Sequence, residues 1–88
     1  MRDERRRRVH KVFVESAAEK DLRRLSTEVH ERAVAAIRKL AENPRPANCR
    51  KLSGTANDWR IRVGDYRVIY EISDETNSIF VNRVRHRR

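Results

Sequence analysis

Arginines that could bind a polyanion stand in the string WRIRVGDYRVIYEI, which spans Trp59–Ile72. Apolar and cationic residues alternate there, and because strand side chains alternate between faces, Arg60 and Arg62 share one face of a strand. The dipeptide Gly64–Asp65 is typical of a two-residue hairpin turn, which sets Arg62 directly opposite Arg67. Like charges that face each other across strands destabilise a sheet. The pattern therefore favours a binding site for a polyanion over a structural hairpin.

The opposite face of the same hairpin is predicted to be buried. Its register pairs Val63 with Tyr66, Ile61 with Val68, and Trp59 with Tyr70. Asp58 and Glu71 fall at the end of the hairpin away from the turn, so carboxylates are poor candidates for proton transfer near the arginines. Two plainer readings remain open: Arg60 and Arg62 could be solvated strand residues, and Arg67 could pair with a core carboxylate.

The composition points to an anionic partner. The chain has 88 residues, enough for one small domain, and its 22 lysines and arginines outnumber 13 acids to give a formal charge of +9. Such an excess favours nucleic acid, an anionic membrane or an acidic protein. A membrane is the weakest of these, because no apolar run approaches the ~18 residues of a spanning helix and no signal-peptide pattern is present. We expect a cytoplasmic protein with no membrane partner and no small-molecule ligand.

Cysteine and histidine usage argues against a metal centre. The single cysteine, Cys49, excludes an intramolecular disulfide and fits a reducing cytosol. Together with His10, His30 and His86 it makes no metal-ligand spacing. We therefore expect neither a metal nor an organic cofactor.

The first half of the chain is predicted to hold a charged arm and a strand. Met1–Arg8 has no apolar residue after the first, and we interpret it as a flexible basic arm, a solvated tail in preference to an arm that binds nucleic acid. Residues 9–88 are predicted to form a single domain. Its first segment, Val9–Val14, is rich in β-branched and aromatic residues, which is typical of a strand.

Two amphipathic helices are predicted to follow this strand. A capping box at Ser16 and Glu19 starts the first, which runs to about Leu25. Ser26–Thr27 begins the second, and Asn43–Pro44 ends it, because proline disfavours the α conformation in the residue before it. The short connection predicts an antiparallel helical hairpin.

The second half is predicted to be a loop and three strands. The loop spans Pro44–Ala56, the hairpin spans Trp59–Ile72, and the apolar run Ile79–Val81 begins a last strand that is buried on both faces. Short connections favour an antiparallel meander for these three strands. The predicted fold class is therefore α+β, in the order strand–helix–helix–strand–strand–strand, with a mainly antiparallel sheet and the helical hairpin packed on one face.

Several local strings resemble those of the RelE/ParE superfamily of toxins from type II toxin–antitoxin systems, and the RelE-like branch in particular. The strings are KDLRRL within Ala18–Leu25, LAENPRP in Leu40–Pro46, KLSG in Lys51–Gly54, the hairpin string in Trp59–Ile72 and VRHRR in Val84–Arg88. They cover nearly all of the chain after the basic arm, and the hairpin string is the most specific. The resemblance implies a RelE-like fold, a cognate acidic antitoxin, and the ribosome and messenger RNA as partners.

In the RelE branch, cationic strand residues cleave messenger RNA in the ribosomal decoding site. Carried over by position, the implied catalytic residues are Arg60, Arg62, Arg67, Arg87 and, beside the last, His86, while Lys51, Arg83, Arg85 and Arg88 are predicted to bind RNA. Arginine keeps its charge and forks onto two phosphate oxygens, but it cannot readily accept a proton. Histidine titrates near neutral pH, so His86 is the candidate for proton transfer, with simple phosphate contact or exposure as its alternative.

Three functions remain open at this point. The leading one is a metal-independent, ribosome-dependent messenger RNA endoribonuclease that inhibits translation as the toxin of a toxin–antitoxin pair. The second is a ParE-like, non-catalytic inhibitor of DNA gyrase, against which the strand arginines argue. The third is a catalytically impaired RNA-binding relative, because the sequence ends at Arg88 without the tyrosine that the family usually places several residues beyond its terminal arginine.

Overall fold

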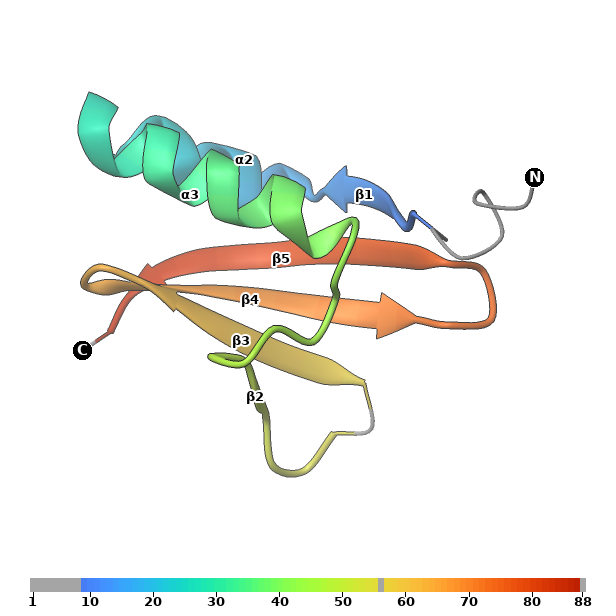
Figure 1. Cartoon of the computed structure of the whole chain (residues 1–88). Coiled ribbons are helices and arrows are strands. Elements are labelled where there is room, and N and C mark those ends of the chain that lie inside the picture. Colours follow the sequence, from blue (N-terminus) through green and yellow to red (C-terminus); the bar gives the residue numbers. More distant parts are fainter. Residues whose placement is uncertain (1–8, 56, 88) are drawn as a thin grey trace.

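The computed structural model describes residues 9–55 and 57–87, which form an α+β fold with two helices over a sheet (Figure 1). The elements in chain order are β1 (Lys11–Val14), α2 (Ser16–Arg23), α3 (Thr27–Leu40), β2 (Arg50–Lys51), β3 (Asp58–Val63), β4 (Tyr66–Ser73) and β5 (Ser78–His86). The predicted N-terminal arm, residues 1–8, and the C-terminal Arg88 lie outside the described residues.

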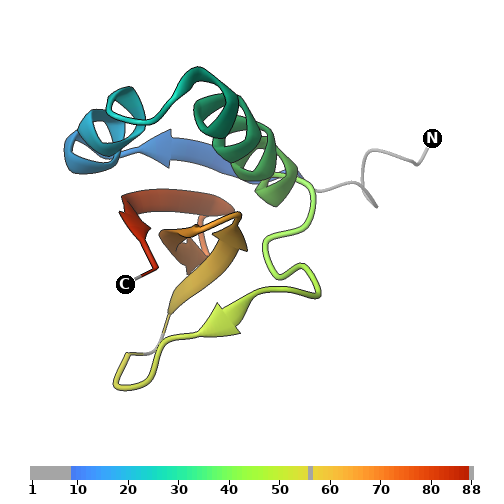
Figure 2. The same ribbon diagram turned by 90° about the vertical axis from the view of Figure 1, so that its left-hand side faces the viewer.

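The five strands lie in the order β1-β5-β4-β3-β2. β1 runs parallel to β5, and the other neighbouring pairs are antiparallel. The predicted meander of β3, β4 and β5 is confirmed, and the helical hairpin covers one face of the sheet (Figure 1, Figure 2). We call the other face, which neither helix covers, the open face. Neither α2 nor α3 is both long and apolar enough to cross a membrane.

The core lies between the helices and the sheet. α3 contributes Ala33, Ile37 and Leu40, at the i, i+4, i+7 spacing of one helix face. The sheet contributes residues from one face of its three long strands, namely Ile61, Val63, Val68, Tyr70, Ile72, Ile79, Val81 and Val84. A shift in the β4–β5 register puts Val81 and Val84 three residues apart on this face. The predicted register of the β3–β4 hairpin is confirmed at each pair. Gly64 lies in its turn with a φ of 59°, a conformation that glycine adopts without the steric cost of a Cβ atom.

The start of α2 differs from the prediction. Glu15 rather than Ser16 occupies the N-cap position, and no side chain caps the helix. The Glu15 backbone N–H donates to the Val81 carbonyl at 2.9 Å, so the strand pairing continues up to the first helical residue. The predicted capping box at Ser16 and Glu19 is therefore wrong. Ser26, by contrast, caps α3 by accepting a hydrogen bond of 3.4 Å from a backbone N–H of the first turn.

Two further differences concern the strands. Arg50–Lys51 forms β2 within the segment Pro44–Ala56 that was predicted as a loop, because two residues are too few to show an alternating pattern. The run Ile79–Val81 is not fully buried on both faces, since only one face lies under helices. Phe80 points to the open face, where it is half-buried and stacks on Phe13 with ring centroids 5.4 Å apart.

Tyr70 ties the core to the loop that follows α3. Its side chain is fully buried, and its hydroxyl donates a hydrogen bond of 2.7 Å to the Pro44 carbonyl. Burial raises the pKa of Tyr70 above its ordinary value of 10.0, so the phenol stays protonated. This bond holds the loop that leads into β2 close to the sheet.

Candidate nucleic-acid interface

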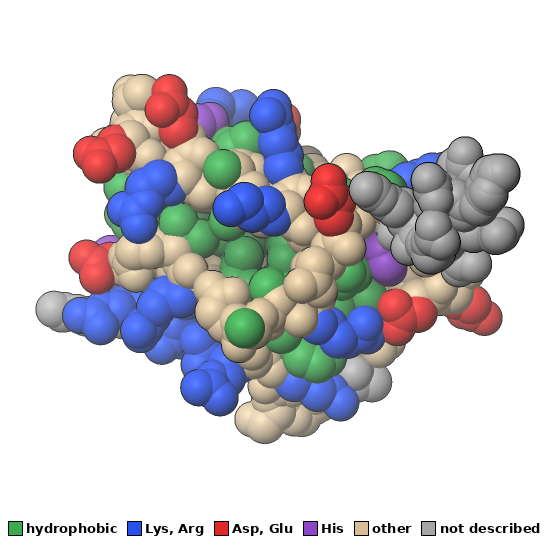
Figure 3. Space-filling model, in the orientation of Figure 1, with side chains coloured by type: hydrophobic (Ala, Val, Ile, Leu, Met, Phe, Trp, Pro, Cys, Tyr) green, Lys and Arg blue, Asp and Glu red, His purple; other side chains and the backbone are tan. Residues whose placement is uncertain are grey.

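One row of arginines crosses three strands on the open face. Arg62 of β3 lies directly opposite Arg67 of β4, and Arg67 lies directly opposite Arg85 of β5. These positions alternate with core residues along each strand, which places the three guanidinium groups on the face away from the helices. We call this set the Arg67 row. Lys and Arg side chains gather at the matching end of the molecule in the space-filling view (Figure 3).

A second set of arginines lies beside the Arg67 row, nearer the middle of the strands. Arg50 of β2 is directly opposite Arg60 of β3, while Ile69 of β4 separates Arg60 from Arg83 of β5. Arg60 is half-buried, and Arg50 is exposed. The sheet register thus repeats the like-charge opposition that the sequence predicted for Arg62 and Arg67.

Apart from Arg83, these arginines have no carboxylate partner among the described residues. The ion pairs of the described residues join Arg45 and His10 to Asp74, Arg83 to Asp21, and Arg87 to Asp65. Within residues 9–55 and 57–87, no ion pair neutralises Arg50, Arg60, Arg62, Arg67 or Arg85. The proposed pairing of Arg67 with a core carboxylate is therefore absent from the described part of the chain.

Arg67 carries an unsatisfied donor. Its Nε atom is buried and has no hydrogen-bond partner among the described residues. A buried donor without a partner costs about 1–3 kcal/mol. Such a group is expected where a ligand supplies the missing acceptor.

Arg87 and His86 lie at the same end of the sheet but differ in their surroundings. The Arg87 backbone N–H donates to the Asp65 carbonyl at 2.8 Å, and its Nε lies 3.6 Å from the Asp65 carboxylate. Both contacts hold Arg87 at the β3–β4 turn. His86 is opposite Tyr66, and the two rings meet edge to face with centroids 5.2 Å apart. The register therefore places His86 on the helix side, not on the open face with the Arg67 row.

The remaining predicted RNA-binding residues do not gather as one group. Arg83 donates to the Asp21 carboxylate through Nε at 2.9 Å and through Nη2 at 3.3 Å. This bidentate bond, with a third from Val84 N–H, holds the pKa of the Asp21 carboxyl below its ordinary value despite its burial. Lys51 is opposite Trp59, which places it on the helix side of the sheet. Arg83 therefore has a structural role, because its guanidinium group is bound to the Asp21 carboxylate.

Arg50 was missed as a candidate in the sequence. Its signal is the opposition to Arg60, which depends on a strand of two residues that the sequence pattern did not indicate. With Asn48, Arg60 and Arg62, Arg50 lines a hollow of about 270 Å³ at the β2 edge of the sheet.

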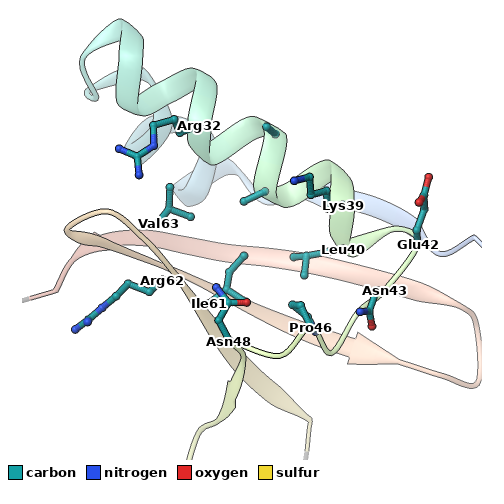
Figure 4. Close-up of a pocket in the computed structure, with 12 residues that line it drawn as sticks. Arg32, Lys39, Leu40, Glu42, Asn43, Pro46, Asn48, Ile61, Arg62 and Val63 are labelled. Carbon is teal, nitrogen blue, oxygen red and sulfur yellow. The ribbon is translucent and has the colours of Figure 1, made fainter.

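A larger groove of about 670 Å³ lies on the other side of β3, between that strand and α3 (Figure 4). Leu40, Ile61 and Val63 form its apolar floor. Arg32 and Lys39 of α3 stand at its rim, and the side chain of Arg62 points away from the helix (Figure 4). The groove and the arginines of the open face therefore meet along β3.

Comparisons with known proteins agree on one kind of protein. The chain is similar to the RelE–RelB complex from Pyrococcus horikoshii, with 27% identity, a TM-score of 0.81, and coverage of 90% of this chain and 96% of that one. It is also similar to a RelBE2 toxin–antitoxin complex from Mycobacterium tuberculosis, with 27% identity, a TM-score of 0.79, and coverage of 90% and 92%. The intact RelBE complex from E. coli matches at 29% identity and a TM-score of 0.76, over 88% of this chain and 95% of that one.

A comparison with curated proteins gave no match. The model of the family described as "ParE toxin of type II toxin-antitoxin system, parDE" matches residues 12–88, which is nearly the whole chain. The fold is that of the RelE toxins in the structures above. The chain therefore belongs to the ParE toxin family of type II toxin–antitoxin systems, within the RelE/ParE superfamily.

Proposed function

We propose that this toxin inhibits translation by cutting messenger RNA on the ribosome, without a metal ion. The observation that carries the proposal is the Arg67 row, in which Arg62, Arg67 and Arg85 face one another across strands without carboxylate partners in the described chain. A sheet gains no stability from three facing cations. The negatively charged phosphodiester of RNA would supply the anionic partner that these three side chains lack.

The row suits the chemistry of RNA cleavage. The 2′-hydroxyl attacks the adjacent phosphate, a new bond forms from its oxygen to phosphorus, and the 5′-oxygen of the next nucleotide leaves. Negative charge on the phosphate oxygens rises on the way to the transition state, and preorganised cations aimed at that charge lower the barrier. Arg62 and Arg67 take this role, with Arg60 on the same face of β3 and Arg87 at the adjoining turn.

Proton transfer needs a second kind of group. We assign the transfer of protons to or from the reacting oxygens to His86, which lies at the end of the sheet beside Arg87. Because its register places it on the helix side, this assignment requires the scissile phosphate to lie at that end of the sheet, between Arg87 and the Arg67 row. The imidazole ring of His86 contacts the ring of Tyr66 edge to face. Arg85 serves as a further contact to the RNA backbone, whereas Lys51 lies on the helix side of the sheet and has no part in this site.

An acidic antitoxin is the proposed protein partner. The solved relatives named above are complexes of RelE with RelB, and this chain carries a formal charge of +9. Opposite charge speeds the encounter of two proteins, and apolar contacts then hold the complex. Covering the arginines of the open face inhibits the toxin in this proposal.

Primer extension on a messenger RNA under translation tests the cleavage. The wild-type chain is expected to create new 5′ ends only when ribosomes are present, and Arg67→Ala is expected to lower the rate about 10²–10³-fold, as for other transition-state donors. Arg38→Ala, an exposed arginine of α3, is the matched control and keeps full activity. Full cleavage by Arg67→Ala would contradict the proposal.

The family assignment favours one second candidate, inhibition of DNA gyrase without catalysis, because the matching family model is that of ParE toxins. The same protein samples separate the two candidates in a gyrase supercoiling assay. Loss of supercoiling together with intact messenger RNA identifies the gyrase inhibitor. Binding of RNA without cleavage or gyrase inhibition identifies the catalytically impaired relative.

A further inference from the structure

The hollow at the β2 edge has a lining suited to one anion. Among the described residues, Asn48, Arg50, Arg60 and Arg62 line its volume of about 270 Å³. Three of these side chains end in a guanidinium group, which can donate two parallel hydrogen bonds to two oxygens of a phosphate. The fourth, Asn48, has an amide N–H₂ that serves as a neutral donor. We call this site the Arg50 hollow.

The charges around the Arg50 hollow are uncompensated. Arg50 is directly opposite Arg60, and neither has an ion pair within the described residues. Asp58 and Glu71 face each other two residues further along the strands, at the end away from the turn. Two like charges in register weaken the pairing of so short a strand, and a bound anion would relieve that repulsion.

The position of the Arg50 hollow relates it to the Arg67 row. Arg60 and Arg62 are two residues apart on β3, so their side chains leave the same face about 6–7 Å apart. This spacing is comparable to the distance between successive phosphates of an extended RNA strand. Arg62 belongs to both the row and the hollow, which makes the two sites continuous.

We propose that the Arg50 hollow binds the backbone phosphate next to the one that the Arg67 row holds, with Arg50 as its specific residue. The inference rests on the proposed function, since it assumes RNA as the ligand of the open face. Asn48 donates to the same phosphate through its side-chain N–H₂. The hollow contacts backbone and no base edge, so it contributes affinity without sequence preference.

Binding of a single-stranded RNA with methylated 2′-hydroxyl groups tests the hollow apart from cleavage. Fluorescence anisotropy of the full chain at several salt concentrations compares wild type with Arg50→Ala, Arg50→Lys and the control Arg38→Ala. We expect Arg50→Ala to weaken binding about tenfold and to lower the salt slope by about 0.7, the value for one lost phosphate contact on a single strand. Arg50→Lys should keep the slope but lose part of the affinity, because lysine lacks the fork.

A set of RNAs with one neutral methylphosphonate linkage each locates the phosphate. Arg50→Ala should become insensitive to neutralisation at one linkage, and Arg67→Ala at the linkage beside it. Equal RNA affinity and equal salt slope for Arg50→Ala and Arg38→Ala would contradict the proposal that the Arg50 hollow binds a phosphate. The absence of RNA binding by the wild type at low salt would contradict it as well. Arg50-dependent binding without ribosome-dependent cleavage would instead reject the ribonuclease function and leave the phosphate site standing.

Discussion

The carboxylate of Asp21 in α2 accepts a hydrogen bond of 2.8 Å from the backbone N–H of Val84 in β5. The pairing of β1 with β5 ends at Val14 and Val81, so a helix side chain satisfies the strand edge where β1 no longer covers it. Arg83 forks onto the same carboxylate from the strand. This contact holds the part of β5 that leads directly to Arg85, His86 and Arg87.

Asp21→Asn is expected to destabilise the fold by about 1.5–3 kcal/mol at neutral pH, because hydrogen bonds to a charged group are among the stronger ones. Its pKa is lowered in the folded state, so the unfolded state binds the proton more readily. The contribution is therefore present above the ordinary value of 3.8 and is lost as pH falls through the folded pKa. Urea unfolding of wild type and variant from pH 7 down to pH 2 measures the difference, which should shrink with acid.

Glu75→Gln is the matched control for this experiment, because Glu75 is an exposed acid without an ion pair in the described residues. It should leave the unfolding free energy nearly unchanged at each pH. A difference between Asp21→Asn and wild type that persists undiminished at pH 2 would mean that the carboxylate charge is not the stabilising feature.

The arginines of the sheet should separate into two classes by stability. Arg83→Ala removes the bidentate partner of Asp21 and is expected to lower the unfolding free energy. Arg62→Ala removes one of two facing cations and is expected to leave the unfolding free energy unchanged or slightly raised. Chemical denaturation of both variants under identical conditions gives the comparison. Equal destabilisation would show that Arg62 has a structural role after all.

Tyr70→Phe is expected to cost about 1 kcal/mol, because it removes the hydroxyl that donates to Pro44 while the ring still fills its site. The pKa of Tyr70 is raised in the folded state, so only the unfolded state ionises readily above the ordinary value of 10.0. Wild-type stability should accordingly fall as pH rises beyond about 10, and the variant should lose that part of the dependence. Denaturant midpoints between pH 8 and pH 11 test this, and a parallel decline of both proteins would speak against it.

Association with an acidic antitoxin is expected to be fast at low salt and to slow steeply as salt is added, because charge steers the encounter. The double variant Arg62→Ala/Arg67→Ala should reduce the association rate constant more than it raises the dissociation rate constant. Stopped-flow mixing with the purified antitoxin from 50 to 500 mM salt measures both constants. An association rate constant that does not change with salt would contradict electrostatic steering of the two proteins.

The sequence by itself determined the β3–β4 hairpin, including the opposition of Arg62 and Arg67. Alternation of apolar and cationic residues sets the faces of a strand, and a two-residue turn at Gly64 sets the register, so both signals are local. Amphipathic spacing, which is also a local signal, predicted the second helix, α3.

Only the tertiary structure decided which arginines are available to a ligand. Arg83 and Arg85 look alike in the sequence, yet Arg83 is held by Asp21 from a helix 62 residues earlier, while Arg85 continues the Arg67 row. Arg50 joins the open face through a strand too short to leave a periodic pattern. Pairings between distant segments depend on how the helices and sheet pack together, because alternation along one segment carries no information about which other segment will lie beside it.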